Sequence, residues 1–503
     1  MDPSSDHHEY CTGGFDPEDI VISGMSGRFP ESDSVRELKE GLYNKKDFVV
    51  FTDKRFEKGA YHAPYDSSGL IKELDKLDIN FFHVAYAHAQ QMDPASRIHL
   101  EVTYEAIADA GIDATDLRGA RVGVFNATTG EDTVKINTSD ESFVSLNAIR
   151  TMNPNRTTHS FDFTGPSYTI DAACSSSAIA LWSAVNTLRM GQIDAAVVSG
   201  CQLNLHPCML AGYIGAGIVS TTGNSRPFDA KSDGMIKTEA VTAIFLQKAK
   251  VARRVYAIIP AIRCYSAGYV PEGVNVPSDV MQKRIMLDTL NDANVDINDI
   301  DFIEAHGTGT QVGDKIELNA IAEVFCKNRS KPLLVGAVKS NIGHTEASSG
   351  ICGVIKSILA FEYESIPPNI KFEVPNPNTP ALLDGKLVVV TEPTPFKKDY
   401  IPINSLGFGG TLVQILLKKN PIAPGGKKQE SNIPRLILFP GTTEEAITTI
   451  FEYLQNTPNL PEEFFALLNK LSFTDPSLKP FRGYALYQGG NCPIKEIRVR
   501  YSY

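Results

Sequence analysis

Three short segments of the chain combine the residue types used in nucleophilic catalysis. Cys174 lies in Asp171–Ser177, where a strand-like stretch gives way to helical spacing over residues 175–190. A thiol in the first turn of a helix meets about half a positive charge and free N–H groups. These favour the thiolate and can hold an oxyanion. The alternative is a buried structural cysteine, the usual role of a lone cysteine, and this segment alone leaves both interpretations open.

Two histidines follow, each at a predicted strand end beside glycines and hydroxyls. His306 lies in Glu-Ala-His-Gly-Thr-Gly-Thr (304–310), and His344 ends Lys-Ser-Asn-Ile-Gly-His (339–344). Because ligands of α/β proteins gather at the carboxyl ends of strands, we expect both imidazoles to share one site with Cys174. A zinc site would need a third ligand at a matched spacing, and none is visible. A cysteine protease would leave the second histidine motif unused.

The elements that must position these residues alternate between strand and helix. Apolar strands are predicted at 19–24, 120–125, 195–199, 240–245, 256–261, 302–304, 333–338, 387–390 and 412–416, and helices at 97–110 and 280–293. This alternation predicts α/β architecture with sheets covered on both faces. It runs through two comparable halves, 19–250 and 255–418, which suggests a duplicated fold. A Pro/Gly/charged stretch from 420 then precedes a predicted strand (435–439) and two helices (443–454 and 462–471).

Composition narrows the function classes. The chain has 503 residues, of which 42% are apolar and 21% charged, and its net charge of −11 argues against a nucleic-acid-binding surface. No segment approaches the roughly 20 apolar residues of a membrane span, and the acidic start is unlike a targeting signal. The eight cysteines include no Cys-x-x-Cys pair, which favours free thiols in a reducing compartment. We therefore expect a cytoplasmic protein.

Taken together, the three segments resemble the signature motifs of β-ketoacyl synthases in type I fatty acid and polyketide synthases. The likeness continues at 22–30, 93–97, 226–229 and 404–411, with the motifs in the expected order. Residues 434–438 and 480–485 are similar to the linker domain that follows the ketosynthase in animal-type fatty acid synthases. The resemblance implies a thiolase-like, duplicated α/β/α/β/α fold. It also implies a ketosynthase domain at 19–418 and a small α/β linker domain at 419–503, with the acyltransferase absent; the residues of the first stretch, 1–18, are themselves typical of disorder.

The resemblance further implies a decarboxylative Claisen condensation. Cys174 would take an acyl group from the phosphopantetheine of an acyl carrier protein, and a malonyl or methylmalonyl thioester would extend it. The resemblance implies no metal and no cofactor belonging to this chain. It also implies a homodimer. The implied catalytic residues are Cys174, His306, His344 and Lys339; the implied substrate-binding or gating residues are Phe408, Thr308, Thr310, Gly407 and Gly409; and Glu346 and Asn404 would support the site.

Several alternatives stay open at this point. Thr308 and Thr310 could simply stabilise their loop, and Lys339 and Glu346 could form a surface ion pair. Asp229 and Asp314 are expected to be structural loop residues. The sequence also departs from the family's usual pattern, with Leu412, Gln414, Ala172 and the segments 153–154 and 234–237 in place of its common residues. A catalytically silent scaffold and a stand-alone condensing enzyme that uses coenzyme A thioesters are the rival functions.

Overall fold

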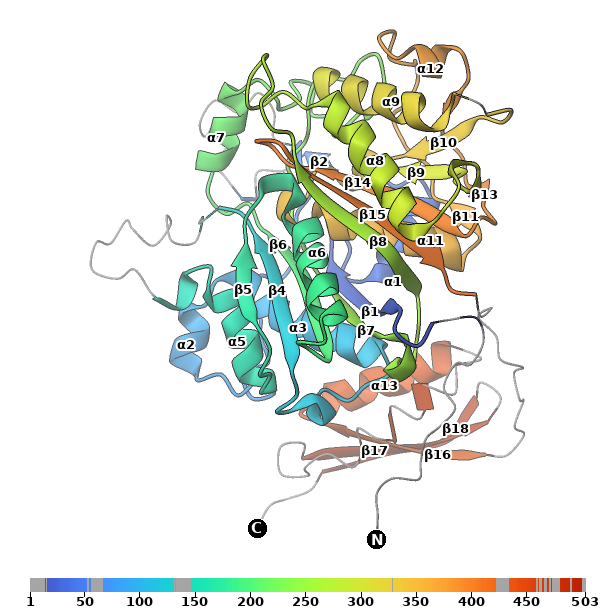
Figure 1. The fold of residues 1–503 in the computed structure, drawn as a ribbon. Coiled ribbons are helices and arrows are strands. Elements are labelled where there is room, and N and C mark those ends of the chain that lie inside the picture. The colour runs from blue at the N-terminus through green and yellow to red at the C-terminus, as the bar shows by residue number, and fades with distance from the viewer. Residues whose placement is uncertain are drawn as a thin grey trace.

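A computed structural model of the chain provides the structure (Figure 1). It describes residues 14, 16–51, 54–55, 67–130, 132, 146–327, 329–421, 434–457, 460, 464–465, 468–469, 472, 480–488 and 491–499. Most of the stretch 1–18 and of the predicted helix 462–471 therefore lies outside the described residues. In the described part, no helix combines the length and the apolar character needed to cross a membrane.

Most strands form one sheet of eleven. Its order is β12-β10-β9-β14-β15-β8-β1-β7-β6-β4-β5. In chain order these strands are β1 (Ile20–Arg28), β4 (Val122–Thr128), β5 (Ser167–Ile170), β6 (Ala195–Gln202), β7 (Ala240–Lys248), β8 (Ala257–Ser266), β9 (Phe302–Glu304), β10 (Leu333–Gly336), β12 (Leu387–Val389), β14 (Tyr400–Leu406) and β15 (Thr411–Lys419). All nine strands expected from the sequence are confirmed.

The two halves of this sheet have the same topology. The first half runs β1-β7-β6-β4-β5 and the second runs β8-β15-β14-β9-β10, with β12 as an additional edge strand beyond β10. Apart from β12, each half orders its strands first, fifth, fourth, second, third. The directions also match: the first two pairings of each half are antiparallel and the last two are parallel. The halves meet where β1 pairs antiparallel with β8, which is the arrangement of two copies about an approximate twofold axis. The expected duplication is therefore confirmed.

Helices lie inside the fold and on both of its outer faces. The inner pair is α6 (Ser176–Arg189) and α11 (Ser349–Glu362), which pack on each other and on both halves of the sheet. α3 (Pro94–Asp109) and α5 (Met152–Phe161) cover the outer face of the first half, and α8 (Asp279–Ala293) and α9 (Gln311–Phe325) that of the second. This gives the α/β/α/β/α layering expected from the sequence.

Apolar side chains on both faces of the strands hold these layers together. Every residue of β6 is buried; Ala196 and Val198 face the inner helices, whereas Val197 faces α3. Such strands read as continuous apolar runs because neither face meets water. α11 is similar: all its residues except Glu362 are buried. The inner layer is thus an apolar block, and the few polar groups within it need partners.

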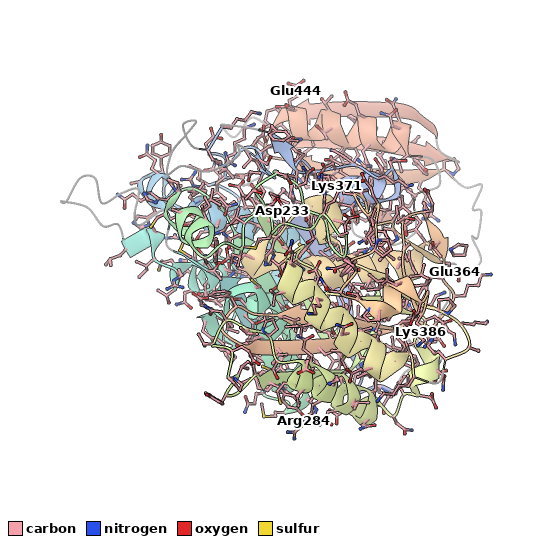
Figure 2. The ribbon with its side chains drawn as sticks, turned by 90° about the horizontal axis from the view of Figure 1, so that it is seen from above. Asp233, Arg284, Glu364, Lys371, Lys386 and Glu444 are labelled. Atoms are coloured by element: carbon pink, nitrogen blue, oxygen red, sulfur yellow. The ribbon has the colours of Figure 1, made fainter. Side chains whose placement is uncertain are left out.

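The C-terminal part forms a separate small sheet. Strands β16 (Arg435–Gly441), β17 (Phe481–Gln488) and β18 (Asn491–Val499) are antiparallel, with α13 (Glu444–Asn456) packed on them. This matches the small α/β unit expected after the linker. In the view from above, Glu444 of α13 and Arg284 of α8 mark opposite sides of the molecule, with Asp233 between them (Figure 2).

The remaining elements are short. They are α1 (Val35–Tyr43), β2 (Val50–Phe51), β3 (Ser67–Ser68), α2 (Tyr86–Gln91), α7 (Cys208–Gly215), α10 (Lys339–Ile342), β11 (Ser365–Ile366), α12 (Pro380–Leu383) and β13 (Thr394–Pro395).

Candidate active site

Cys174 lies on a tight turn between β5 and α6. The sequence places it in the first turn of the helix; the structure instead puts it in a 3-10 turn, Ala173–Ser175, directly before α6. Ala173 has φ +50°, an uncommon left-handed conformation for alanine. The carbonyl of Cys174 accepts hydrogen bonds from Ser349 Oγ (2.8 Å) and Ser405 Oγ (3.3 Å). These contacts tie the turn to α11 and β14 and fix the direction of the thiol.

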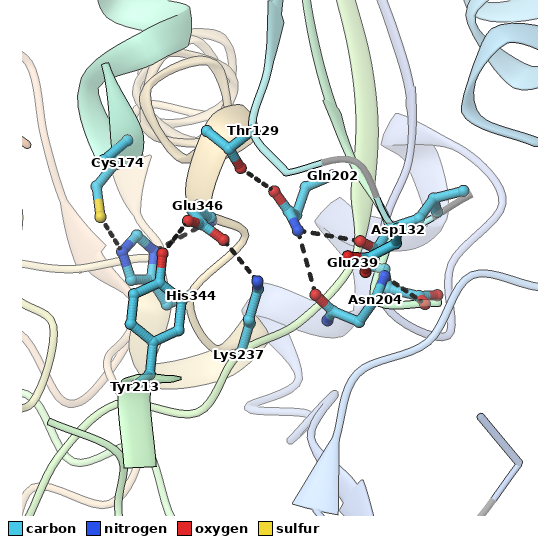
Figure 3. Close-up of polar contacts among 12 residues, drawn as sticks. Thr129, Asp132, Cys174, Gln202, Asn204, Tyr213, Lys237, Glu239, His344 and Glu346 are labelled. Carbon is cyan, nitrogen blue, oxygen red and sulfur yellow. Dashed lines mark hydrogen bonds and ion pairs between the residues drawn. The ribbon is translucent and has the colours of Figure 1, made fainter. Parts of the chain in front are cut away.

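His344 comes from the equivalent connection of the other half, between β10 and α11. Its Nε2 lies 3.0 Å from Cys174 Sγ, as Figure 3 shows. Its Nδ1 accepts the backbone N–H of Glu346 at 3.3 Å, so in the neutral ring the proton is on Nε2. The imidazole therefore points an N–H donor at the sulfur.

His306 has the same tautomer. Its Nδ1 accepts the backbone N–H of Leu406 at 3.3 Å, which leaves Nε2–H as the ring's donor. The His306 and His344 rings lie edge to face, with centroids 5.6 Å apart. Burial, with Lys339 nearby, lowers the pKa of both imidazoles well below the usual value. Both rings are thus neutral donors at physiological pH.

Lys339 is buried and supports the loop of His306. Its Nζ donates to the His306 carbonyl at 2.7 Å. Burial lowers the pKa of this ammonium. The interpretation of Lys339 and Glu346 as a surface ion pair is wrong, because both are buried and Glu346 has another cation as its partner. Lys237 Nζ lies 2.9 Å from Glu346 Oε2, and the hydroxyl of Tyr213 donates to the other oxygen (Figure 3).

The protonation state of Cys174 differs from the expectation. Burial, followed by the carboxylate of Glu346, raises the pKa of the thiol to about 12. The backbone N–H of Phe408 and the cations of Lys339 and Lys237 oppose that shift without cancelling it. The prediction of a resting thiolate considered only the helix N-terminus. The resting site holds a thiol, which must lose its proton as it reacts.

A cavity of about 480 Å³ opens onto these groups. Its wall includes Cys174 and both histidines. Five other predicted site residues also line it: Thr308, Thr310, Gly407, Phe408 and Gly409. The backbone N–H of Phe408 hydrogen-bonds the sulfur of Cys174, whereas the residue as a whole is 42% exposed. The Thr308 and Thr310 hydroxyls bond each other at 3.1 Å, so at least part of their role is within the loop.

Asn404 and Glu317 support the site from behind. Glu317 accepts the N–H groups of His306 (2.7 Å) and Gly307 (2.9 Å), and Asn404 Nδ2 donates to the same carboxylate at 2.9 Å. Gln414 Nε2 in turn donates to Asn404 Oδ1 at 3.1 Å. Asn404 therefore acts through Glu317 on the loop of His306. Gln414, where the sequence departs from the family pattern, therefore supports the site through Asn404.

Sequence reasoning missed several functional positions. Tyr213 and Glu317 reach the site from segments without a motif of their own, and Lys237 ends the segment 234–237, which the sequence marks only as a departure from the family pattern. Asp314 was expected to be a loop residue; it lies in α9, lines the cavity and accepts the N–H groups of Phe228 and Gly309. Burial raises the pKa of its carboxyl to about 7. Asp229 does hold a loop, by accepting the N–H groups of residues 373 and 374.

The three reactive side chains also supply three possible metal-ligand atoms. The donor atoms of Cys174, His306 and His344 lie within 4.8 Å of one another, so the fold provides the third ligand that the sequence spacing did not show. Their hydrogen bonds oppose metal binding, however. A metal on Nε2 would need the ring proton on Nδ1, where the backbone N–H groups of Leu406 and Glu346 already donate.

Comparisons with known proteins agree with this geometry. Residues 17–252 match the β-ketoacyl synthase N-terminal domain, residues 256–373 its C-terminal domain, and residues 375–486 the ketoacyl-synthetase C-terminal extension. The boundary between the first two matches lies between β7 and β8, which are the last strand of the first half and the first strand of the second. The third spans β12, β14 and β15 of the large sheet and part of the small one.

The chain is 39% identical over 350 residues to a fatty acid synthase of Anser anser anser, covering 69% of this chain and 99% of that sequence. It is 34% identical over 423 residues to a highly reducing polyketide synthase of Alternaria alternata, covering 79% of this chain but only 16% of that protein.

Solved structures show the same fold. A ketosynthase from the bacillaene synthase of Bacillus subtilis 168 superposes with a TM-score of 0.83 at 27% identity, covering 94% of this chain and 83% of that one. The oxazolomycin ketosynthase domain of Streptomyces albus JA3453 gives 0.86 at 23% identity, covering 96% and 90%. The chain therefore belongs to the β-ketoacyl synthase family, the acyl-transferring condensing enzymes of fatty acid and polyketide synthases.

Proposed function

We propose that this chain elongates an acyl group held on Cys174 by decarboxylative Claisen condensation with a malonyl or methylmalonyl thioester. The observation that carries the proposal is the convergence of one thiol and two neutral N–H donors on a single cavity. Cys174 Sγ and His344 Nε2 are 3.0 Å apart, and the His306 ring lies beside them. This set can accept an acyl group and then stabilise an enolate, which are the two steps of the reaction.

In the first step the sulfur of Cys174 attacks the acyl thioester. A new C–S bond forms to Cys174 and the bond to the carrier's sulfur breaks. The thiol proton leaves with that departing sulfur, so the exchange is balanced. The backbone N–H groups of Cys174 and Phe408 would hold the tetrahedral oxyanion; the N–H of Phe408 already faces the sulfur. The donor from His344 stabilises the thiolate while it exists.

In the second step the extender thioester loses CO₂. The electron pair of the broken C–C bond becomes an enolate, whose oxygen accepts hydrogen bonds from Nε2–H of His306 and His344. Neutral imidazoles suit this task, since they donate without surrendering their protons. The enolate carbon then attacks the acyl carbon, and the sulfur of Cys174 leaves and is reprotonated. Lys339 positions His306 through its carbonyl.

The remaining assignments extend the proposal to the protein's partners. We infer that the substrates arrive on the phosphopantetheine of an acyl carrier protein, with Thr308 and Thr310 near the arm and Phe408 as a gate. The polyketide synthase relative supports this, because this chain matches only 16% of its length and the matched part there belongs to a much longer synthase. A homodimer and a cytoplasmic location remain predictions. So do the domain limits 19–418 and 419–503.

Intact-protein mass spectrometry after incubation with an acyl thioester tests the first step. The wild type should gain one acyl mass, and Cys174→Ala should gain none. Cys208→Ala is the matched control, because Cys208 is a free, exposed cysteine outside the site; it should still be acylated. An adduct that survives Cys174→Ala would overturn the assignment.

Release of CO₂ from a malonyl thioester tests the second step. His306→Ala and His344→Ala should still be acylated, yet each should release CO₂ at least about 100-fold more slowly, the usual cost of losing one oxyanion donor. Full decarboxylation by either variant contradicts its role. A wild type that neither acylates nor decarboxylates would instead support the silent scaffold.

A further inference from the structure

Glu346 has a backbone conformation that a residue with a side chain rarely adopts. Its φ is +40°, in the left-handed region, and it is buried two residues after His344. Such a conformation is unfavourable for a residue with a Cβ and persists only where the surrounding contacts impose it. It matters to the site, because in this conformation the backbone N–H of Glu346 donates to His344 Nδ1 at 3.3 Å.

That N–H decides which nitrogen of the His344 ring carries the proton. The backbone of His344 is fixed separately: its N–H donates to the Ile236 carbonyl at 2.7 Å, and its carbonyl accepts the Thr238 N–H at 3.0 Å. Those bonds leave the tautomer of the ring open. A donor at Nδ1 keeps the ring proton on Nε2, which faces Cys174 Sγ at 3.0 Å. The useful tautomer therefore depends on the conformation of Glu346.

Two side chains hold the carboxylate of Glu346 in place. The hydroxyl of Tyr213 donates to Oε1, and Lys237 Nζ lies 2.9 Å from Oε2 (Figure 3). The Lys237 ammonium also lies over the Tyr213 ring, 5.1 Å from its centroid. Because both oxygens are engaged, the side chain of Glu346 is anchored at its far end. These contacts can impose the strained backbone conformation at its near end.

Tyr213 is the member of this group that comes from outside the apolar core. It lies in α7, an apolar helix that has no buried residue, and it lines the cavity with Cys174. Packing of α7 therefore does little to fix the phenol, whereas a hydroxyl bound to a buried carboxylate forms one of the stronger kinds of hydrogen bond. Burial, followed by the charge of Glu346, raises the pKa of the phenol. The hydroxyl therefore keeps the proton that it donates.

We propose that Tyr213 is a positioning residue for decarboxylation: its hydroxyl anchors Glu346, whose backbone N–H then keeps the His344 proton on Nε2. The proposal rests on the proposed function, in which that N–H donor stabilises the enolate. Phenylalanine at position 213 would still line the cavity but would leave Oε1 of Glu346 without its donor. The backbone of Glu346 can then relax and withdraw its N–H, and the ring proton can move from Nε2 to Nδ1. A ring in that form offers the enolate no donor.

Release of CO₂ from a malonyl thioester is measured for Tyr213→Phe. The rate should fall about tenfold, the equivalent of one lost hydrogen bond, while Cys174 is still acylated. Tyr265→Phe is the matched control: its hydroxyl donates to Asp288 at 2.7 Å and it does not line the cavity, so it should keep the wild-type rate. In a His344→Ala protein, Tyr213→Phe should change the rate by less than about twofold, because both act through one ring. An equal loss in both backgrounds, or no loss in either, would overturn the proposal.

NMR of the substrate-free proteins, labelled with ¹⁵N in histidine, provides a second readout. The signals missing from His344→Ala identify that ring, and its spectrum distinguishes Nε2–H from Nδ1–H. The wild type and Tyr265→Phe should show Nε2–H alone, whereas Tyr213→Phe should show both forms. A single Nε2–H form in Tyr213→Phe would overturn the proposal. Failure of the proposed function looks different, because the wild type would then release no CO₂, whichever tautomer it holds.

Discussion

Lys356→Met should destabilise the protein strongly, although Lys356 does not line the cavity at Cys174. Its Nζ forms an ion pair of 2.7 Å with Glu304 Oε2, and the two side chains are 1% and 2% exposed. Glu304 also accepts the Val338 N–H at 2.6 Å. Without the lysine, a buried carboxylate keeps only that single hydrogen bond. Breaking one side of a buried pair costs about 3–5 kcal/mol, so we expect a loss of this size in the free energy of unfolding.

Equilibrium urea denaturation measures the loss. Lys386→Met is the matched control: the side chain of Lys386 is 60% exposed and its carboxylate partner is 3.9 Å away, so it should change stability by no more than about 0.5 kcal/mol. The double variant Lys356→Met with Glu304→Gln should recover much of the loss, because no buried charge remains and the amide oxygen still accepts from Val338. A single variant within about 1 kcal/mol of the wild type would refute the reasoning.

Three further outcomes are expected. Alkylation of Cys174 by iodoacetamide should keep rising with pH beyond pH 9, because burial raises the pKa of this thiol to about 12; a plateau between pH 6 and 8 would contradict that. Burial lowers the pKa of His99 to about 4. The stability that the neutral ring contributes to the folded state is therefore complete above about pH 6.5 and is lost as the pH falls toward 4. His99→Gln should therefore be less acid-sensitive in urea titrations, by up to about 3 kcal/mol over that interval. Gly407→Ala should fold but acylate at least about tenfold more slowly by mass spectrometry, since its Cβ would lie 2.4 Å from Ser175 Oγ; unchanged acylation would show that the cysteine turn tolerates the shift.

The fold, and the convergence of Cys174 with two histidines, could be predicted from the sequence, because both follow from local patterns. Buried strands appear as β-branched runs, and Cys174, His306 and His344 each follow a strand end beside small residues. Parallel strands present those ends at one edge, so convergence on a shared site could be expected. The family resemblance added the order of the motifs.

What the sequence could not supply was pairing between distant segments. In the sequence, Lys356 looks like an ordinary solvated lysine in the middle of a helix. In the structure all of α11 except its last residue is buried, so the ammonium of Lys356 needs the carboxylate of Glu304 as its partner. Lys237 and Tyr213 meet Glu346 only in three dimensions. The prediction of a thiolate at Cys174 is wrong for the same reason, since the pKa of the thiol depends on burial and on the carboxylate of Glu346.

The duplicated topology has a consequence for how the reaction centre is held together. Cys174 and His344 come from equivalent connections of the two halves, and these halves touch where Gly350 of α11 approaches α6: a Cβ at Gly350 would lie 3.0 Å from the Ala178 nitrogen. The distance between Cys174 and His344 therefore depends on how closely α6 and α11 pack, and neither loop sets it alone. A rotation of one half relative to the other would therefore change the distance between Cys174 and His344. Each half thus contributes only part of the site, and the contact between α6 and α11 sets the distance between the two parts.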